Sequence, residues 1–149
     1  MQTEIKHKWF YASSPEVVWE YLTNAELIAQ WLMPNDFKPI VGHKFQFYSR
    51  PVPEIGFDGN SYCTILEIIP NKKLSYTWQC GPGNGVITVD TIVTYTLTAK
   101  DNGTELLLHQ TGFKEKENLA IYSAMHDGWL KHIKMIDEQI NAQHGTAKA

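Results

Sequence analysis

Hydrophobic and polar residues alternate along this chain with two different periods, which separate a sheet-forming middle from a helical end. Between residues 44 and 113, apolar side chains recur at every second position, as on strands with one buried face. From 119 to 142 they recur every three or four positions, as on an amphipathic helix. The segment 4–11 also reads as a strand, so the sequence predicts an α+β fold.

Turn-forming residues divide the alternating region into five strands. We predict these strands over 44–50, 57–69, 73–80, 86–99 and 103–113, which with 4–11 give a sheet of about six. The separating turns contain Pro70-Asn71, the glycine-rich stretch 81–85 and Asp101-Asn102-Gly103. Two prolines and two glycines in the segment 50–60 predict a mobile loop there.

Helix signals occur on both sides of this region. Two short helices are predicted after the first strand, because Ser14 followed by Pro15 suits the start of one and Asn24 suits the start of the next. Asn118 is the expected cap of the long helix, in which Gly128 costs about 1 kcal/mol relative to alanine. A close backbone approach would explain that glycine. The apolar face of this helix comprises Tyr122, Met125, His126, Trp129, Ile133, Ile136 and Ile140.

The turns also predict which strand faces point inward, because directly opposed residues share a face. A two-residue turn at Asp101-Asn102 places Leu97 opposite Leu106, and the turn near residue 71 places Leu66 opposite Tyr76. One inward wall follows: Thr64, Leu66, Tyr76, Trp78, Val89, Thr91, Val93, Tyr95, Leu106, Leu108 and Gln110.

The same register has a consequence for the two cysteines. The loop 81–85 pairs Trp78 with Val89, and Cys63 and Cys80 then lie on opposite faces of the sheet. No disulfide is expected between them, and both are interpreted as small buried hydrophobes.

Several sequence blocks, in this order and spacing, resemble a known family. They are residues 12–19 (ASSPEVVW) with 22–24 (LTN), 41–45 (VGHKF), 66–70 (LEIIP) with 74–78 (LSYTW), 103–106 (GTEL) with 111–113 (TGF), and 126–129 (HDGW). The chain resembles the activator of heat-shock protein 90 ATPase-like family, within the START-like (SRPBCC) superfamily. The resemblance implies a helix-grip fold like that of the birch-pollen allergen, in which a curved antiparallel sheet wraps a long C-terminal helix.

The resemblance also implies two kinds of function. Superfamily relatives bind lipids, polyketides, hormones or other apolar molecules between sheet and helix, and a few catalyse cyclisations. In the eukaryotic co-chaperone this module follows a separate N-terminal domain, for which the present 149 residues leave no room. We therefore expect this chain alone not to stimulate a chaperone ATPase strongly.

Composition and charge indicate the class of protein and its expected location. A chain of 149 residues with 43% hydrophobic and 19% charged residues predicts one globular domain over 1–142, followed by a flexible tail over 143–149. The net charge of -3 predicts no general attraction to nucleic acid or an anionic membrane. No apolar run approaches the ~20 residues of a membrane helix. The polar N-terminus lacks the core of a signal peptide, so a cytoplasmic location is expected.

Motifs for metal, phosphate or covalent chemistry are not evident. The six histidines are scattered, and neither a His-Glu-x-x-His nor a Cys-x-x-Cys sequence occurs, so we expect no metal and no cofactor. The stretch 81–85 lacks the Lys-Ser/Thr ending of a phosphate loop and reads as a hairpin turn. No nucleophile has a neighbouring base at a known spacing, which predicts a protein that is not an enzyme. Distant Tyr76, Gln110 and His126 could still assemble a cyclase or hydrolase site.

The leading hypothesis is non-catalytic binding of a small, mostly apolar, aromatic or lipid-like molecule between sheet and helix. The alternatives are a co-chaperone-type module acting on the heat-shock protein 90 ATPase and, third, an enzyme on hydrophobic substrates; homodimer formation is left open. The loops 50–60 and 114–118 are candidates for the cavity rim. The predicted ligand-binding residues are Thr64, Tyr76, Trp78, Thr91, Val93, Tyr95, Gln110, Tyr122, His126 and Trp129.

Two structural readings compete with this hypothesis. His126 either anchors the ligand or forms a hydrogen bond with Gln110 or a strand tyrosine. The inward aromatic side chains either line a cavity or fill the interior completely. Inward polar groups such as Thr91 and Gln110 favour a cavity, since buried hydroxyls and amides need partners.

Overall fold

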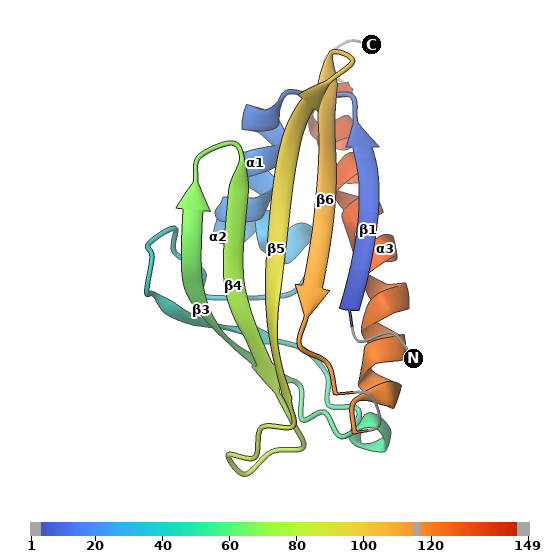
Figure 1. Ribbon diagram of the computed structural model, residues 1–149. Helices are drawn as coiled ribbons and strands as arrows, with labels where there is room; N and C mark the ends of the chain where they lie inside the picture. Colours follow the sequence, from blue (N-terminus) through green and yellow to red (C-terminus); the bar gives the residue numbers. More distant parts are fainter. Residues whose placement is uncertain (1–3, 115–116, 146–149) are drawn as a thin grey trace.

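A six-stranded antiparallel sheet, with the strand order β1-β6-β5-β4-β3-β2, forms one layer of the molecule (Figure 1). The computed structural model describes residues 4–114 and 117–145. The strands are β1 (Glu4–Tyr11), β2 (Lys44–Tyr48), β3 (Asn60–Ile69), β4 (Lys73–Cys80), β5 (Val89–Lys100) and β6 (Gly103–Thr111). The predicted helix-grip fold is confirmed.

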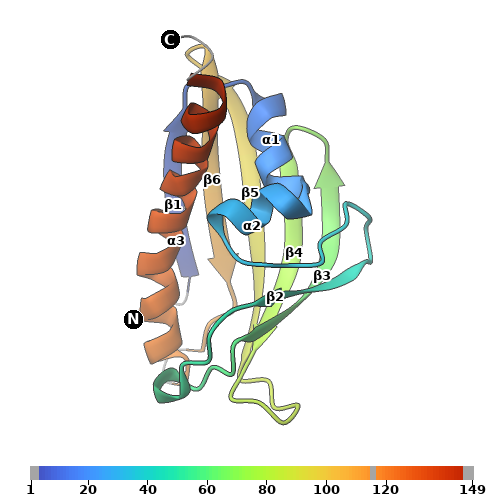
Figure 2. The same cartoon turned by 180° about the vertical axis from the view of Figure 1, so that it is seen from behind.

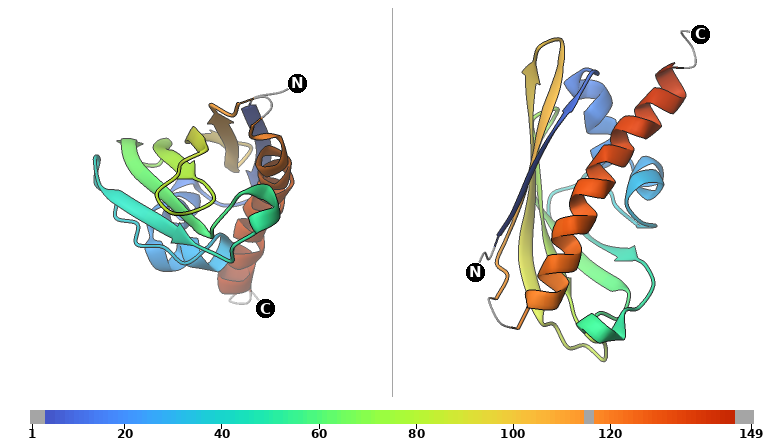
Figure 3. Two further views of the ribbon diagram at one scale, coloured as in Figure 1. Left: turned by 90° about the horizontal axis from the view of Figure 1, so that it is seen from below. Right: turned by 90° about the vertical axis from the view of Figure 1, so that its right-hand side faces the viewer.

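Three α-helices cover one face of this sheet, as the view from behind shows (Figure 2). They are α1 (Pro15–Thr23), α2 (Ala25–Trp31) and α3 (Leu119–Ile140). Figure 3 shows α3 crossing the sheet obliquely, with α1 and α2 beside its C-terminal half. A single 3-10 turn, η1 (Pro53–Ile55), lies next to the N-terminal end of α3, and a π-helical turn, η2 (Asn141–Gly145), follows α3.

The short helices begin where the sequence predicted. The Ser14 side chain accepts a hydrogen bond from the Val17 amide, and Asn24 accepts from the amides of Glu26 and Leu27. The cap of α3 differs from the prediction, because the Asn118 side chain makes no cap hydrogen bond. Its oxygen accepts from the Lys114 amide and its nitrogen donates to the Thr88 carbonyl, so it connects the start of α3 to the end of the loop that precedes β5.

Several strands are shorter than predicted, for reasons of backbone geometry. β3 begins at Asn60 rather than 57, directly after Gly59, which has φ +96° and approaches Ser49 closely. β5 begins at Val89 rather than 86, since the preceding residues complete the hairpin loop. β6 ends before Gly112, whose φ of +109° turns the chain away from the sheet.

Strand pairing confirms one part of the predicted register and corrects the others. Leu97 lies opposite Leu106, as the turn at Asp101 and Asn102 predicted. Both turn residues have positive φ, 49° and 62°, as in a two-residue type I′ hairpin. Trp78 lies opposite Thr91 rather than Val89. That shift of two residues leaves every β4 and β5 side chain on its predicted face.

The inward face of β3 was predicted wrongly. A β-bulge between Ile65 and Glu67 places Ile65, not Leu66, opposite Tyr76. Leu66 is consequently 43% exposed, and Thr64 also leaves the inward wall. An extra residue in one strand inverts the faces beyond it, and alternation alone does not reveal it.

The bulge also brings the cysteines to the same side. Cys63 and Cys80 both belong to the buried core, so the prediction of opposite faces was wrong. Both are free thiols, as expected for small buried hydrophobes.

Candidate functional site

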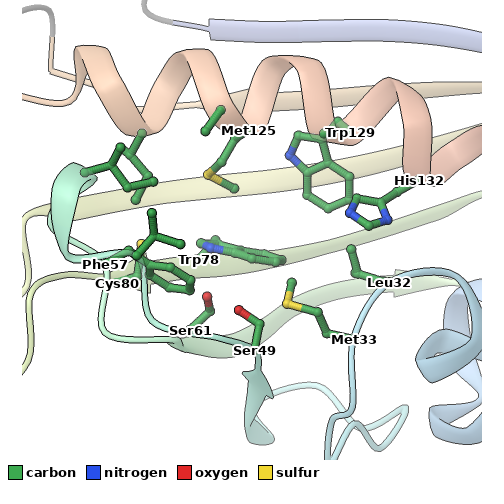
Figure 4. A pocket seen from close by; sticks show the side chains of 15 residues that line it. Leu32, Met33, Ser49, Phe57, Ser61, Trp78, Cys80, Met125, Trp129 and His132 are labelled. Carbon is green, nitrogen blue, oxygen red and sulfur yellow. The ribbon is translucent and has the colours of Figure 1, made fainter.

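A cavity of about 340 Å³ lies between the sheet and the N-terminal half of α3 (Figure 4). Its floor comes from β3 and β4, its roof from α3, and its remaining sides from the end of α2 and the irregular segment that contains η1. The lining residues are Leu32, Met33, Ser49, Val52, Ile55, Phe57, Ser61, Trp78, Cys80, Ile121, Ala124, Met125, Gly128, Trp129 and His132. Most of these side chains are apolar.

Two tryptophans form the inner wall of the cavity. Their rings meet edge to face with centroids 5.6 Å apart, Trp78 from β4 and Trp129 from α3. The Phe47 ring stacks on the Trp78 ring, with their centroids 4.8 Å apart. Such aromatic pairs add to the stability that burial alone provides and fix the orientation of the rings.

A chain of hydrogen bonds holds these tryptophans from behind. The Trp129 indole N–H donates to Oε1 of Gln110 at 2.8 Å. The Gln110 amide donates to Oγ1 of Thr91 at 2.8 Å, and Thr91 donates to the Trp78 carbonyl at 2.9 Å. Gln110 and Thr91 are fully or almost fully buried. Because each buried polar group has a partner, the wall is held in one arrangement without water or ligand.

Two serines supply polar groups to the cavity. Ser61 on β3 is only 1% exposed, and its hydroxyl has no hydrogen-bond partner among the described residues. Ser49, after β2, is exposed and makes one long contact of 3.5 Å with the Arg50 carbonyl. Figure 4 shows both hydroxyls on the cavity side of their backbones. A buried hydroxyl without a partner is costly, so Ser61 marks a place where a polar ligand atom would be stabilised.

His132 contributes the only imidazole among the lining residues. Its Nδ1 lies 2.8 Å from the Trp31 carbonyl oxygen. Burial lowers the pKa of His132, and the positive charge of Lys131 acts in the same direction, against the hydrogen bond to Trp31. The ring is therefore neutral at physiological pH.

Cys80 lies at the opposite end of the cavity near Phe57 (Figure 4). Burial raises the pKa of its thiol to about 12, and Asp58 adds to this effect. The thiol is therefore protonated at neutral pH and is a poor nucleophile.

Among the ten residues predicted to bind ligand, the structure places only Trp78 and Trp129 at the cavity. Thr91, Val93 and Gln110 are buried behind the tryptophan wall. Tyr76 and Tyr95 also lie in the core, where their hydroxyls bond to each other at 2.6 Å. Burial raises the pKa of both phenols, so this pair is neutral. Thr64 points away, as described above.

The remaining two predicted residues, Tyr122 and His126, lie on the β1 side of α3. The Tyr122 hydroxyl donates to the Glu4 carbonyl at 2.9 Å. The His126 ring is 4.7 Å from the ring of His7, and its Nδ1 lies 3.4 Å from Asp127. Neither residue lines the cavity, and His126 contacts neither Gln110 nor a strand tyrosine through a hydrogen bond in the described structure.

Ser61, His132 and the position of Gly128 in the cavity lining were not predicted from the sequence. Ser61 was hidden by the bulge in β3, which reverses the inward face. His132 follows Ile121, Met125 and Gly128 at helical spacing, and this row flanks the buried stripe on the cavity side. The helical spacing of this row is visible in the sequence, but His132 lies outside the predicted apolar face, which contained His126 instead.

Of the two loops predicted to border the cavity, the structure describes one completely and the other in part. The segment 50–60 contributes Val52, Ile55 and Phe57 to the cavity, so it does border the site. The second loop, 114–118, includes residues 115 and 116, which lie outside the described residues, as do 146–149 of the predicted tail.

No group of three potential ligands for a metal ion occurs within residues 4–114 and 117–145. The helices in these ranges include none with the length and apolar character needed to cross a membrane.

Comparison with known proteins gives one family and many similar folds. Residues 12–141 match the family model described as activator of Hsp90 ATPase homolog 1-like protein. None of the curated proteins compared with the chain gives a match.

Three solved structures illustrate the similarity. Protein MLL2253 from Mesorhizobium loti is 32% identical, with a TM-score of 0.82, over 93% of this chain and 97% of that one. BH1534 from Bacillus halodurans is 26% identical, with a TM-score of 0.71, over 92% and 96% of the two chains. The Aha1 dimer from Colwellia psychrerythraea is 18% identical, with a TM-score of 0.72, over 92% and 95%. At that last identity, the likeness shows the fold alone.

Proposed function

The chain belongs to the activator of Hsp90 ATPase homolog 1-like family, and from this premise we propose that it binds a small, mostly apolar molecule between its sheet and α3. The observation that carries the proposal is the apolar cavity of about 340 Å³ with the unpartnered hydroxyl of Ser61 in its lining. Ligand pockets typically combine such walls with a few polar groups and begin at ~300 Å³.

The rigidity of the wall supports the same proposal. The hydrogen bonds from the Trp129 indole through Gln110 and Thr91 end at the Trp78 backbone carbonyl, and the Trp78 ring packs between its contacts with Phe47 and Trp129 without help from a ligand. A site that is already arranged loses little conformational entropy on binding. Flat ring faces and edges at this wall favour an aromatic or otherwise rigid apolar ligand.

We also propose that binding is not followed by covalent catalysis. The Cys80 thiol is held protonated by burial, with a pKa of about 12. The Ser61 hydroxyl has no base within hydrogen-bonding distance among the described residues. The Ser49 hydroxyl, the third such group in the lining, contacts only the Arg50 carbonyl among the described residues, so none of the three has the activation that covalent catalysis requires.

The test is a titration with a panel of hydrophobic compounds, in which binding is monitored by the fluorescence of Trp78 and Trp129. Native mass spectrometry of gently purified protein would in addition detect a ligand that remains bound. Gly128→Leu would place a side chain in the cavity, whereas Ser123→Leu adds the same side chain at an exposed position of the same helix. We expect binding to be lost only in Gly128→Leu. The absence of binding by the unmodified chain to every compound would refute the proposal.

The family description favours a second function, stimulation of a chaperone ATPase. A steady-state assay with heat-shock protein 90 and micromolar amounts of this chain tests it directly. We expect little stimulation by the isolated module. Strong stimulation that survives in Gly128→Leu would replace ligand binding as the leading function, because it would not depend on the cavity.

We further propose that the chain forms homodimers and is located in the cytoplasm. The Colwellia relative is described as a dimer, which supports the proposal that this chain also forms homodimers. Light scattering coupled to size-exclusion chromatography tests it. The two free cysteines suit the proposed cytoplasmic location, where thiols remain reduced.

A further inference from the structure

The ring of His132 presents one hydrogen-bond acceptor whose identity is fixed by its surroundings. Nδ1 lies 2.8 Å from the Trp31 carbonyl oxygen, which can only accept a hydrogen bond. Nδ1 must therefore carry the proton. In a neutral imidazole the other nitrogen, Nε2, then has a lone pair and no proton.

This acceptor is free to meet a ligand. No hydrogen bond to Nε2 of His132 occurs among the described residues, and Nε2 is not one of the side-chain atoms that are fully buried without a partner. His132 lines the cavity, and Figure 4 places its ring at the Trp129 end, above Leu32. Ser61 lies nearer the other end, beside Phe57 and Trp78, so the two polar groups do not compete for the same ligand atom.

The charge of the lining restricts what His132 can accept. No lysine or arginine is among the residues that line the cavity. A carboxylate or phosphate would therefore bring its negative charge to a bare lone pair without a compensating cation, which is unfavourable in an apolar site. A neutral hydroxyl or N–H group instead donates directly to Nε2 and leaves no charge buried.

We propose that the ligand is a neutral aromatic or alicyclic molecule with a hydroxyl or N–H group, which donates a hydrogen bond to Nε2 of His132 while the apolar body lies against Trp78 and Trp129. This inference rests on the proposed function, because it specifies the ligand of the same cavity. It makes His132 a specificity-determining residue, and it predicts discrimination between ligands of nearly equal shape.

Two probes that differ in one hydrogen-bond donor, a hydroxyl in place of a methoxy group, test the inference. 4-Phenylphenol and 4-methoxybiphenyl share a ring system and an oxygen atom, but only the phenol donates a hydrogen bond. In calorimetric titrations we expect the unmodified chain to bind the phenol about five- to tenfold more tightly, the effect of one net hydrogen bond. Equal affinities would overturn the role of His132 and leave apolar binding intact, whereas no binding of either probe would count against the proposed function itself.

Variants on α3 show whether His132 is the cause. His132→Phe removes the acceptor, so the two probes should then bind with about equal affinity. His132→Gln retains an acceptor and should preserve part of the preference for the phenol. His126→Phe is the matched control, since His126 lies on the same helix outside the cavity. A preference that persists in His132→Phe, or disappears in His126→Phe, would contradict the assignment.

A measurement without any substitution keeps the inference testable if His132→Phe does not fold. Long-range ¹H–¹⁵N spectra resolve the two ring nitrogens of each histidine. The phenol should shift the Nε2 resonance of His132, and the methyl ether should shift it much less. An unchanged Nε2 resonance at saturating phenol would overturn the inference.

Discussion

The two ends of α3 rest on very different surroundings, although one periodic pattern runs along the whole helix. Residues of β1 contact both ends of α3, but only the C-terminal end also lies beside α2, and there Ile133, Ile136 and Ile140 are at most 2% exposed. At the N-terminal end, Met125, Gly128 and Trp129 border the cavity instead. The difference comes from the covering segment, because a helix fills the space at one end and an irregular loop spans it at the other.

Hydrogen bonding at the packed end shows how buried polar groups are accommodated there. The Tyr11 hydroxyl donates to the Ile133 carbonyl at 2.6 Å, and the Trp31 indole donates to the Tyr21 carbonyl at 2.7 Å. The Tyr21 hydroxyl is buried without a partner in the described structure, as Ser61 is, but it does not line the cavity. A missing partner therefore indicates a site only where space for a ligand adjoins it.

The largest loss of stability is expected at Trp129, which lies between the packed end of α3 and the end that borders the cavity. Trp129→Ala removes a side chain that is 3% exposed and leaves Oε1 of Gln110 unpaired. It should lower the free energy of unfolding by roughly 3–5 kcal/mol, measured by urea denaturation. Trp19→Ala, at a half-buried position of α1, should cost less. Equal losses would mean that Trp129 is not part of the central wall.

A matched pair of truncations compares the two ends directly. Ile133→Ala opens a hole in the packed end and should cost about 2–5 kcal/mol. Met125→Ala, at a half-buried position, only enlarges an existing cavity and should cost less than about 1 kcal/mol. The two urea midpoints provide the comparison. Similar losses would show that the space near Met125 is as tightly packed as that near Ile133.

Gly128→Ala should separate stability from binding. An added Cβ would meet only Cδ2 of His132, at 3.9 Å, so no close backbone approach requires this glycine. Alanine should stabilise the helix by up to about 1 kcal/mol and weaken ligand binding by narrowing the cavity. Gly59→Ala is the control, because its Cβ would lie 2.6 Å from the Ser49 carbonyl oxygen and should destabilise the protein. A destabilised Gly128→Ala would contradict the space described at this site.

The smallest effect concerns pH. Burial holds the pKa of His132 below its ordinary 6.5, so the unfolded chain binds more protons in the window just below that value. The contribution of His132 to stability is therefore fully present above about pH 6.5 and is lost as the pH falls through this window. Urea midpoints at pH 7.5 and 5.5 should differ less in His132→Gln than in the unmodified chain.

The sequence by itself determined the architecture and much of the core. Local signals sufficed for the short helices, since Ser14 and Asn24 cap them as predicted. The turn at Asp101 and Asn102 fixed the pairing of β5 with β6, because a two-residue turn permits one register. The resemblance to the family supplied the arrangement of sheet and helices, and the structure confirms it.

The tertiary structure alone decided where the cavity lies. The bulge at Ile65 turned Ser61 inward, and no alternation in the sequence marks where an extra residue enters a strand. Helical spacing gave the buried stripe of α3 but not its surroundings, so it placed His126 in the predicted apolar face and did not single out His132. Only the packing of β1 on one side and of segment 49–57 on the other placed His126 beside His7 and His132 at the cavity. Periodicity is a property of one element, whereas a cavity depends on how several elements fail to fill the space between them.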